Sequence, residues 1–322
     1  MRDALNIKKM AYRKWLQLRT SYLGTSEWAK VLGISKWGTP LSVYKEKIDG
    51  PEPFDNEILK HGRDQEPVIT TEFERVTKFK LSEDPFIRFH PDFPCLGTNL
   101  DRVTVTPEGP AIVELKTTVG HVYDTWEESG TDIDGNPARL KTDYQIQVQG
   151  QMLVTGYRRA YTIIQVIREY SGTRSHYVIQ KWDYDEKFNS TGKYLNNWWD
   201  NHIVKKDPPP PTQKADLPIA FPRHDPDTEI QITDDILNDF NTLKVIKEKQ
   251  KHLAKTREDL ETKVKIFIGD NERLVDMDEL LATWKNGKPR MYFQSKEFKK
   301  DHPDLYESYK KEGNGSRRFI IK

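Results

Sequence analysis

Three ionisable residues near the middle of the chain have types and spacing that could carry out chemistry. Glu114 and Lys116 stand in the run AIVELK, in which alternate side chains of an extended strand point to opposite faces. Both therefore share a face with Ile112, at the end of an apolar strand that would ordinarily run into the core. Asp101 precedes them in the run LGTNLDRVTV. An acidic and a basic side chain that emerge together at such a position are candidates for a reactive site.

The turn signal TPEG at residues 106–109 lies between these two runs and predicts a β-hairpin. If Pro107 and Glu108 form the centre of the turn, opposed residues have numbers that sum to about 215 or 216. Asp101 then lies opposite Glu114 or one residue away. Directly opposed side chains have Cβ atoms about 5 Å apart, so the two carboxylates repel unless a cation lies between them.

A cation bound by these residues would have oxygen ligands without His or Cys, which favours Mg²⁺ or Mn²⁺ over Zn²⁺. The backbone carbonyl of Leu115 is a further candidate ligand. Such a metal lowers the pKa of a bound water and neutralises charge on a scissile phosphate. Lys116 could orient the attacking water or stabilise the developing negative charge. The alternative is a surface hairpin with a solvated patch, and spacing alone does not decide between the two.

The bulk composition limits the class of protein. The 322 residues carry a net charge of +1, from 51 Lys and Arg against 50 Asp and Glu. Proteins that coat nucleic acid are usually basic overall, so any DNA contact here must come from locally arranged charge. Cys95 is the only cysteine, which excludes disulfides within the chain and four-cysteine metal sites. With no signal peptide and no long apolar run, we expect a cytoplasmic protein.

Helix signals dominate the first 80 residues. Thr25 or Ser26 can cap a helix that ends at Gly33, and Thr39-Pro40 opens a second that stops at Gly50. Residues 54–79 form a third expected helix, which carries Glu66. The run at 140–156 alternates like a strand but has the length of a helix, so periodicity leaves it open. Strands are expected in AYTIIQVIREY and SHYVIQKWDY, followed by a helix that reaches Lys205-Lys206.

The second part of the chain begins with a run of prolines at 208–211. The composition predicts a first domain over residues 1–206, a proline-rich linker over 207–228 and an extension over 229–322. Residues 231–265 are expected to be helical. Strand-like runs follow in LLATWK, RMYFQ and RRFII. The apolar stripe of the helix suits intramolecular packing, and the alternative is a surface that docks a partner or a neighbouring subunit.

Five stretches of the chain, in this order, resemble the YqaJ-like viral recombinase family, which includes phage lambda exonuclease. They cover about residues 18–205 and read RTSYLGTSEWAKVLGISKWGTPLSVYKEK, HGRDQEP, LGTNLDRV, VELKTT and DYQIQVQGQMLVTG. The resemblance implies an α/β (α+β) fold with a restriction-endonuclease-like core, in which helices flank a mixed sheet. It implies a Mg²⁺-dependent 5′→3′ exonuclease on linear double-stranded DNA, a ring of three subunits and a single-strand annealing partner. It also implies a phage or prophage protein in a bacterial host.

The resemblance also assigns roles to residues. It makes the run at 140–156 a helix, on which positions 144 and 147 share a face. Arg19 and Ser26 match residues that hold the 5′-phosphate of the substrate end. Asp101 and Glu114 match the metal ligands of the family, and Lys116 matches its catalytic lysine. Glu66 matches an additional acidic residue near the metals. Tyr144 and Gln147 match polar residues beside the active site. Gln145 and Gln149 are expected to form an exposed polar face.

The chain departs from the family where a basic residue is expected shortly after the catalytic lysine. The run TTVGHVYDTW offers only His121 there, which puts the 5′-phosphate preference in doubt. Two alternatives to the exonuclease remain. One is an endonuclease, or an exonuclease of other polarity, with the same ligands. The other is a DNA-end-binding module without activity, which would be expected to have lost one of Asp101, Glu114 or Lys116.

Overall fold

The central hairpin of the sheet joins β4 (Leu96–Thr106) to β5 (Gly109–Val119) in a computed structural model, which describes residues 3–8, 10–51, 56–168, 175–311 and 317–321. Val103 pairs with Ile112, and Arg102 pairs with Val113. Continuing this register by one residue on each strand places Asp101 opposite Glu114. The predicted hairpin and its register are therefore confirmed.

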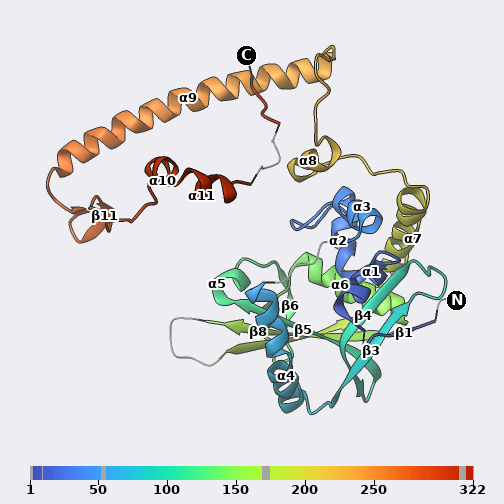
Figure 1. The fold of residues 1–322 in the computed structure, drawn as a ribbon. Coiled ribbons are helices and arrows are strands. Elements are labelled where there is room, and N and C mark those ends of the chain that lie inside the picture. The colour runs from blue at the N-terminus through green and yellow to red at the C-terminus, as the bar shows by residue number, and fades with distance from the viewer. Residues whose placement is uncertain (1–2, 9, 52–55, 169–174, 312–316, 322) are drawn as a thin grey trace. The chain divides into compact units, whose positions relative to one another are not determined.

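The main sheet is mixed (Figure 1), with strand order β1-β3-β4-β5-β8-β9 and β2 paired to β4. The pairs β5–β8 and β2–β4 are parallel, and the others are antiparallel. The further strands are β1 (Leu5–Asn6), β2 (Leu23–Gly24), β3 (Leu81–Phe89), β8 (Arg159–Ile167) and β9 (His176–Asp183). This confirms the predicted α/β class with a central mixed sheet.

Helices and short elements surround this sheet. The predicted cap at Thr25 or Ser26 is wrong, because Glu27 precedes the α-helix that begins at Trp28 and makes no side-chain cap hydrogen bond. Thr39 accepts a hydrogen bond from the backbone N–H of Ser42, with Pro40 at the first helical position, as expected for a helix start. Gly156 ends the run at 140–156, which is helical, with a φ of 75°. The elements are α1 (Tyr12–Arg19), η1 (Thr25–Glu27), α2 (Trp28–Val31), α3 (Pro40–Asp49), α4 (Glu57–Thr77), α5 (Gly120–Tyr123), β6 (Glu128–Thr131), β7 (Pro137–Arg139), α6 (Thr142–Thr155), α7 (Phe188–Trp198) and the π-helix η2 (Trp199–Val204).

Alternate residues of β5 pack against different helices. Val113 faces α4, where Ile69 and Phe73 form a buried cluster with it. Ile112 faces α6 and packs with Val148 and Met152. The two helices therefore cover opposite faces of the sheet (Figure 1), which buries apolar surface on both sides. Because Glu114 and Lys116 share the face of Ile112, they point towards α6.

A buried aspartate holds the segment that follows the prolines. Residues 207–221 include η3 (Lys214–Asp216) and α8 (Leu217–Ala220). Asp216 accepts hydrogen bonds from the Thr39 hydroxyl and, at 2.8 Å, from the Thr212 backbone N–H. The chain divides into two compact units, residues 1–221 and 222–322. The segment around Asp216 thus belongs to the first unit.

The second unit contains one long helix and a small hairpin. Its elements are α9 (Asp234–Ile268), β10 (Arg273–Asp276), β11 (Glu279–Thr283), α10 (Ser295–Asp301) and α11 (Pro303–Ser308). The expected helix and the strand in LLATWK are confirmed. The expected strands in RMYFQ and RRFII are wrong for their described residues, because apolar β-prone residues form a strand only where another strand pairs with them. Across the described ranges, no helix has both the length and the apolar character needed to cross a bilayer.

Candidate active site

Asp101 and Glu114 meet across the β4–β5 hairpin, on the sheet face covered by α6. The backbone N–H of Leu115 donates to Asp101 Oδ2 at 2.9 Å, which fixes the Asp101 carboxylate against β5. Glu114 is only 1% exposed. A buried carboxylate is stable only when donors or cations surround it. The contacts of Glu114 therefore decide what this site can do.

Three side chains donate to the Glu114 carboxylate. Lys116 Nζ lies 2.5 Å from Oε1, and Gln147 Nε2 lies 2.7 Å from the same atom. Gln151 Nε2 lies 2.6 Å from Oε2, so both oxygens have short contacts. The strand alternation of β5 supplies the lysine, and the four-residue spacing on α6 supplies both amides. The result is a carboxylate held in one orientation.

The charges of the cluster shift two pKa values. Burial, followed by the nearby charge of Glu114, raises the pKa of Asp101 to about 7. Burial alone would lower the pKa of the Lys116 ammonium, but the attraction of Glu114 and Asp101 outweighs it and the pKa is raised. Lys116 is therefore a permanent cation at neutral pH. It can donate hydrogen bonds and stabilise negative charge, but it cannot accept a proton.

The structure brings Tyr144 and Gln147 to the same lysine. Lys116 Nζ lies 4.6 Å from the centre of the Tyr144 ring, a cation–π distance, and 3.5 Å from Gln147 Oε1. Lys141 Nζ also lies over this ring, 5.5 Å from its centre. Two lysines therefore lie within cation–π distance of Tyr144.

Glu66 of α4 reaches the site through an arginine. Its Oε2 lies 3.4 Å from Arg102 Nη2, and Arg102 Nη1 donates to the backbone carbonyl of Asp101 at 2.6 Å. In the part of the chain that the structure describes, no group of three His, Cys, Asp or Glu side chains is close enough to hold a metal ion. Glu66 thus stays apart from the pair formed by Asp101 and Glu114.

The donor chemistry of that pair fits a hard cation. Both candidate ligands are carboxylates, and burial followed by the charge of Glu114 raises the pKa of Asp101. A divalent cation between them would relieve this repulsion, because oxygen donors suit Mg²⁺ and Mn²⁺. The two carboxylates therefore fit the expected metal, Mg²⁺ or Mn²⁺.

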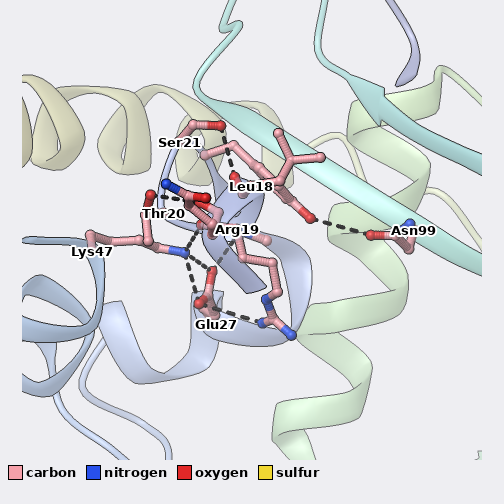
Figure 2. A network of polar contacts seen from close by, with 10 residues as sticks. Leu18, Arg19, Thr20, Ser21, Glu27, Lys47 and Asn99 are labelled. Atoms are coloured by element: carbon pink, nitrogen blue, oxygen red, sulfur yellow. Dashed lines mark hydrogen bonds and ion pairs between the residues drawn. The ribbon is translucent and has the colours of Figure 1, made fainter. Parts of the chain in front are cut away.

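Arg19 lies beside a buried ion pair formed by Glu27 and Lys47 (Figure 2). Arg19 is the last residue of α1, and its guanidinium lies 3.5 Å from Glu27 Oε1. Lys47 Nζ donates to both oxygens of Glu27, at 2.9 and 2.7 Å. Burial opposes the charge of Glu27, but the attraction of Lys47 and Arg19 outweighs it and lowers the pKa of Glu27. Ser26 is exposed, next to this pair.

This region is attached to the strand that carries Asp101. The Thr25 and Thr98 hydroxyls share a hydrogen bond at 2.8 Å, and Tyr22 donates to Asn99 at 3.3 Å (Figure 2). Thr98 precedes Asp101 by three residues on β4, which corresponds to about 10 Å along an extended strand. The Arg19 region and the carboxylate pair are therefore both attached to β4.

Comparison with known proteins now identifies this part of the chain. Residues 14–158 match the family model described as the YqaJ-like viral recombinase domain. Over these residues the chain is similar to a YqaJ-like viral recombinase domain. The match contains every residue of the two clusters, from Arg19 to Gln151, which confirms the family that the sequence motifs indicated.

The chain is also similar to the sequence of a bacterial protein and to solved structures of other proteins. The protein YqaJ of Bacillus subtilis (strain 168) is 26% identical over 323 residues, 98% of this chain and 95% of that protein. An alkaline exonuclease from Laribacter hongkongensis is 15% identical with a TM-score of 0.47, over 60% of this chain and 93% of its own. A phage-related exonuclease from Haemophilus somnus 129PT is 15% identical with a TM-score of 0.39, over 58% and 96%.

Sequence reasoning missed two residues of the YqaJ-like site. Gln151 follows Gln147 by four positions and Tyr144 by seven, so helical spacing alone puts it on the same face. Arg102 stands directly after Asp101, and only the fold brings it to Glu66. Neither was included among the expected site residues.

Two further expectations about side chains have clear outcomes. Gln149 is buried rather than exposed, because its amide bonds to the backbone of Asp183 at 3.0 Å and of Asp185 at 3.0 Å. It closes the contact between α6 and the end of β9. His121, on α5, is exposed and does not join the Arg19 region through any described contact.

Proposed function

We propose that the YqaJ-like domain is a metal-dependent deoxyribonuclease, a 5′→3′ exonuclease that degrades one strand of linear double-stranded DNA. The observation that carries this proposal is the buried Glu114 carboxylate, held between Asp101 and the permanently charged Lys116. Two carboxylates and a lysine on one face of a sheet suit phosphodiester hydrolysis, because that reaction needs a bound cation and a donor for developing charge.

The metal in this proposal is Mg²⁺, with Mn²⁺ as a substitute, held by Asp101, Glu114 and the backbone carbonyl of Leu115. Glu66, oriented by Arg102, is an additional acidic group at the edge of this site. When held by these residues, Mg²⁺ would supply charge neutralisation at the scissile phosphate and a water of lowered pKa.

The protein side chains then orient the reacting groups. Lys116 Nζ donates to the attacking water or to a phosphate oxygen, where its charge offsets the negative charge that develops. Gln147 fixes both partners, because its amide contacts Glu114 at 2.7 Å and Lys116 at 3.5 Å. Tyr144 lies against the same ammonium and limits where it can move. Gln151 holds the far oxygen of Glu114.

The polarity in this proposal comes from Arg19 and Ser26, which bind the 5′-phosphate at the end of the substrate. A guanidinium makes bidentate, charge-assisted hydrogen bonds to phosphate, and a serine hydroxyl adds a further donor. The Arg19 guanidinium is partly exposed beside Glu27, the residue that follows Ser26 in the chain. The resemblance to the family supports a ring of three subunits and a single-strand annealing protein that receives the exposed strand, in a phage or prophage setting within a host cell.

The decisive experiment is degradation of linear duplex DNA labelled at one 5′ or one 3′ end. The wild type and Lys116→Ala are compared with Mg²⁺ and with EDTA, and circular dichroism verifies that the variant is folded. We expect release of the 5′ label as mononucleotide by the wild type with Mg²⁺, and a loss of at least about a hundredfold in the variant.

Other outcomes of that experiment select the alternatives. Release of the 3′ label identifies opposite polarity, and cleavage of circular DNA identifies an endonuclease. DNA binding without degradation under every condition identifies an end-binding module. Equal activity of Lys116→Ala and the wild type would contradict the assignment of the site.

A further inference from the structure

Lys47 and Glu27 form a buried ion pair that the proposed chemistry does not use. Their side chains are 2% and 5% exposed, whereas that of Arg19, the third charged member, is 28% exposed. The pair comes from two different elements, because Glu27 ends η1 and Lys47 stands near the end of α3. Removing two charges from water is costly, so such a pair requires a compensating role in structure or function.

The contacts within this group are unequal. Lys47 Nζ lies 2.9 and 2.7 Å from the two oxygens of Glu27, whereas the Arg19 guanidinium lies 3.5 Å from one of them. Lys47 therefore satisfies most of the carboxylate. The three side chains together carry one net positive charge, and the exposed member of the group is Arg19.

The pair also fixes the backbone on both sides of the exposed guanidinium. Lys47 Nζ donates to the backbone carbonyl of Arg19 at 2.7 Å, which holds the end of α1 (Figure 2). Glu27 Oε2 accepts from the Gly24 backbone N–H at 2.8 Å, which closes the turn that contains Ser26. The Arg19 guanidinium lies over the Trp15 ring, 5.1 Å from its centre. One ion pair thus orients both groups that would meet an anion.

We propose that Lys47 is a positioning residue that neutralises most of the Glu27 charge, so that Arg19, only 3.5 Å from one Glu27 oxygen, keeps its charge available for a terminal phosphate and the enzyme prefers 5′-phosphorylated ends. This inference rests on the proposed function, and specifically on Arg19 as the phosphate ligand. Without the lysine charge, the Glu27 carboxylate would draw the guanidinium into a closer ion pair. Arg19 would then be neutralised and turned away from the DNA end.

The test measures preference rather than activity alone. Binding of duplexes with a 5′-phosphate or a 5′-hydroxyl end is compared in EDTA, and kcat/KM for both duplexes is compared in Mg²⁺. The variants of the full chain are Lys47→Met, Arg19→Ala and the double variant Glu27→Gln with Lys47→Met. Lys80→Met, which removes the exposed partner of Glu74, serves as the matched control.

We expect Lys47→Met and Arg19→Ala each to lower the preference for 5′-phosphate by roughly tenfold, as for the loss of one charge-assisted contact. The double variant removes the carboxylate as well, so we expect it to recover to within about threefold of the wild type. Removing both partners also removes the unpaired buried charge, so the melting temperature would recover in the double variant whatever the role of Lys47. The diagnostic readout is therefore the ratio between 5′-phosphate and 5′-hydroxyl ends, because a loss of stability alone affects both ends equally. Where Lys47→Met does not fold, Lys47→Gln replaces it, since glutamine can still donate to Glu27 without a charge.

Two results would overturn the inference. One is a Lys47→Met or Lys47→Gln variant that keeps the full preference, and the other is a double variant as impaired as the single one. A wild type that degrades DNA without any preference for 5′-phosphate also refutes it, while leaving the nuclease proposal intact. A binding preference for 5′-phosphate with this pattern of rescue supports the role of Lys47 even if no protein degrades DNA. The absence of degradation would then refute the nuclease proposal.

Discussion

Gln151 Nε2 of α6 donates to Glu114 Oε2 of β5 at 2.6 Å, between two residues that are 0% and 1% exposed. Glu114 therefore has a dedicated donor on the oxygen that Lys116 and Gln147 leave unoccupied. The oxygen of the same amide, Gln151 Oε1, has no hydrogen-bond partner among the residues that the structure describes. The amide is thus oriented by Glu114 alone, which makes Gln151 part of the site rather than of the general packing.

Replacing Gln151 by leucine, which has a similar volume, should leave Glu114 Oε2 buried without a donor. We expect a loss of about 1–3 kcal/mol in the free energy of unfolding, because an unsatisfied buried acceptor keeps its desolvation cost. We also expect turnover to fall by about tenfold or more, as for other groups that orient metal ligands. Urea denaturation and steady-state DNA degradation measure the two effects. Gln145→Leu, on the same helix, is the control, because its amide donates to the Leu140 carbonyl instead of a carboxylate.

The raised pKa of Asp101 predicts an unusual pH dependence of stability without metal. The folded pKa is about 7, against an ordinary value of 3.8. Between these values the folded protein retains a proton that the unfolded chain has released, so the free energy of unfolding falls as the pH rises and levels off above the folded pKa. Asp101→Asn removes this dependence, because its side chain does not ionise.

Thermal unfolding in EDTA at about pH 5 and about pH 8 tests the Asp101 prediction. We expect Asp101→Asn to unfold at a higher temperature than the wild type at the higher pH, with a smaller difference at the lower pH. Mg²⁺ at the higher pH should stabilise the wild type more than the variant, since a ligand of the folded state shifts the equilibrium. An identical pH dependence in both proteins would count against the coupled carboxylates.

Asp216 predicts where the first unit ends. Burial opposes its charge, but hydrogen bonds from Thr39 and from the backbone N–H groups of Thr212 and Gln213 outweigh it and lower the pKa of Asp216. A lowered carboxylate pKa stabilises the folded state at neutral pH, and this contribution is lost as the pH falls through the folded pKa. We expect Asp216→Asn to cost about 1–3 kcal/mol in the free energy of unfolding at neutral pH.

Truncated proteins test the same contact directly. A chain that ends after residue 221 retains Asp216, whereas one that ends after residue 206 lacks it. We expect the longer of the two to unfold at the higher temperature, with the difference reduced when it also carries Asp216→Asn. Equal melting temperatures for the two truncated chains would show that the segment contributes nothing to the first unit.

The sequence by itself determined the parts of the site that follow from local periodicity. The turn at 106–109 set the pairing of Asp101 with Glu114, because the register of a hairpin follows from the position of its turn. Strand alternation placed Glu114 beside Lys116, and the family motifs resolved the helix at 140–156 that periodicity left open. Gln151 lies four residues after Gln147, so helical spacing also places it on the same face. It was nevertheless not among the predicted site residues.

Only the tertiary structure decided the contacts between residues that are distant in the sequence. Glu27 and Lys47 are twenty positions apart on different elements, and each would be a solvated surface charge in any local interpretation. Asp216 reaches Thr39 across most of the first unit, from a segment whose prolines predicted an extended linker. Such pairs form because a buried charge must find its partner in the folded protein, wherever the packing of the helices and the sheet brings one within reach.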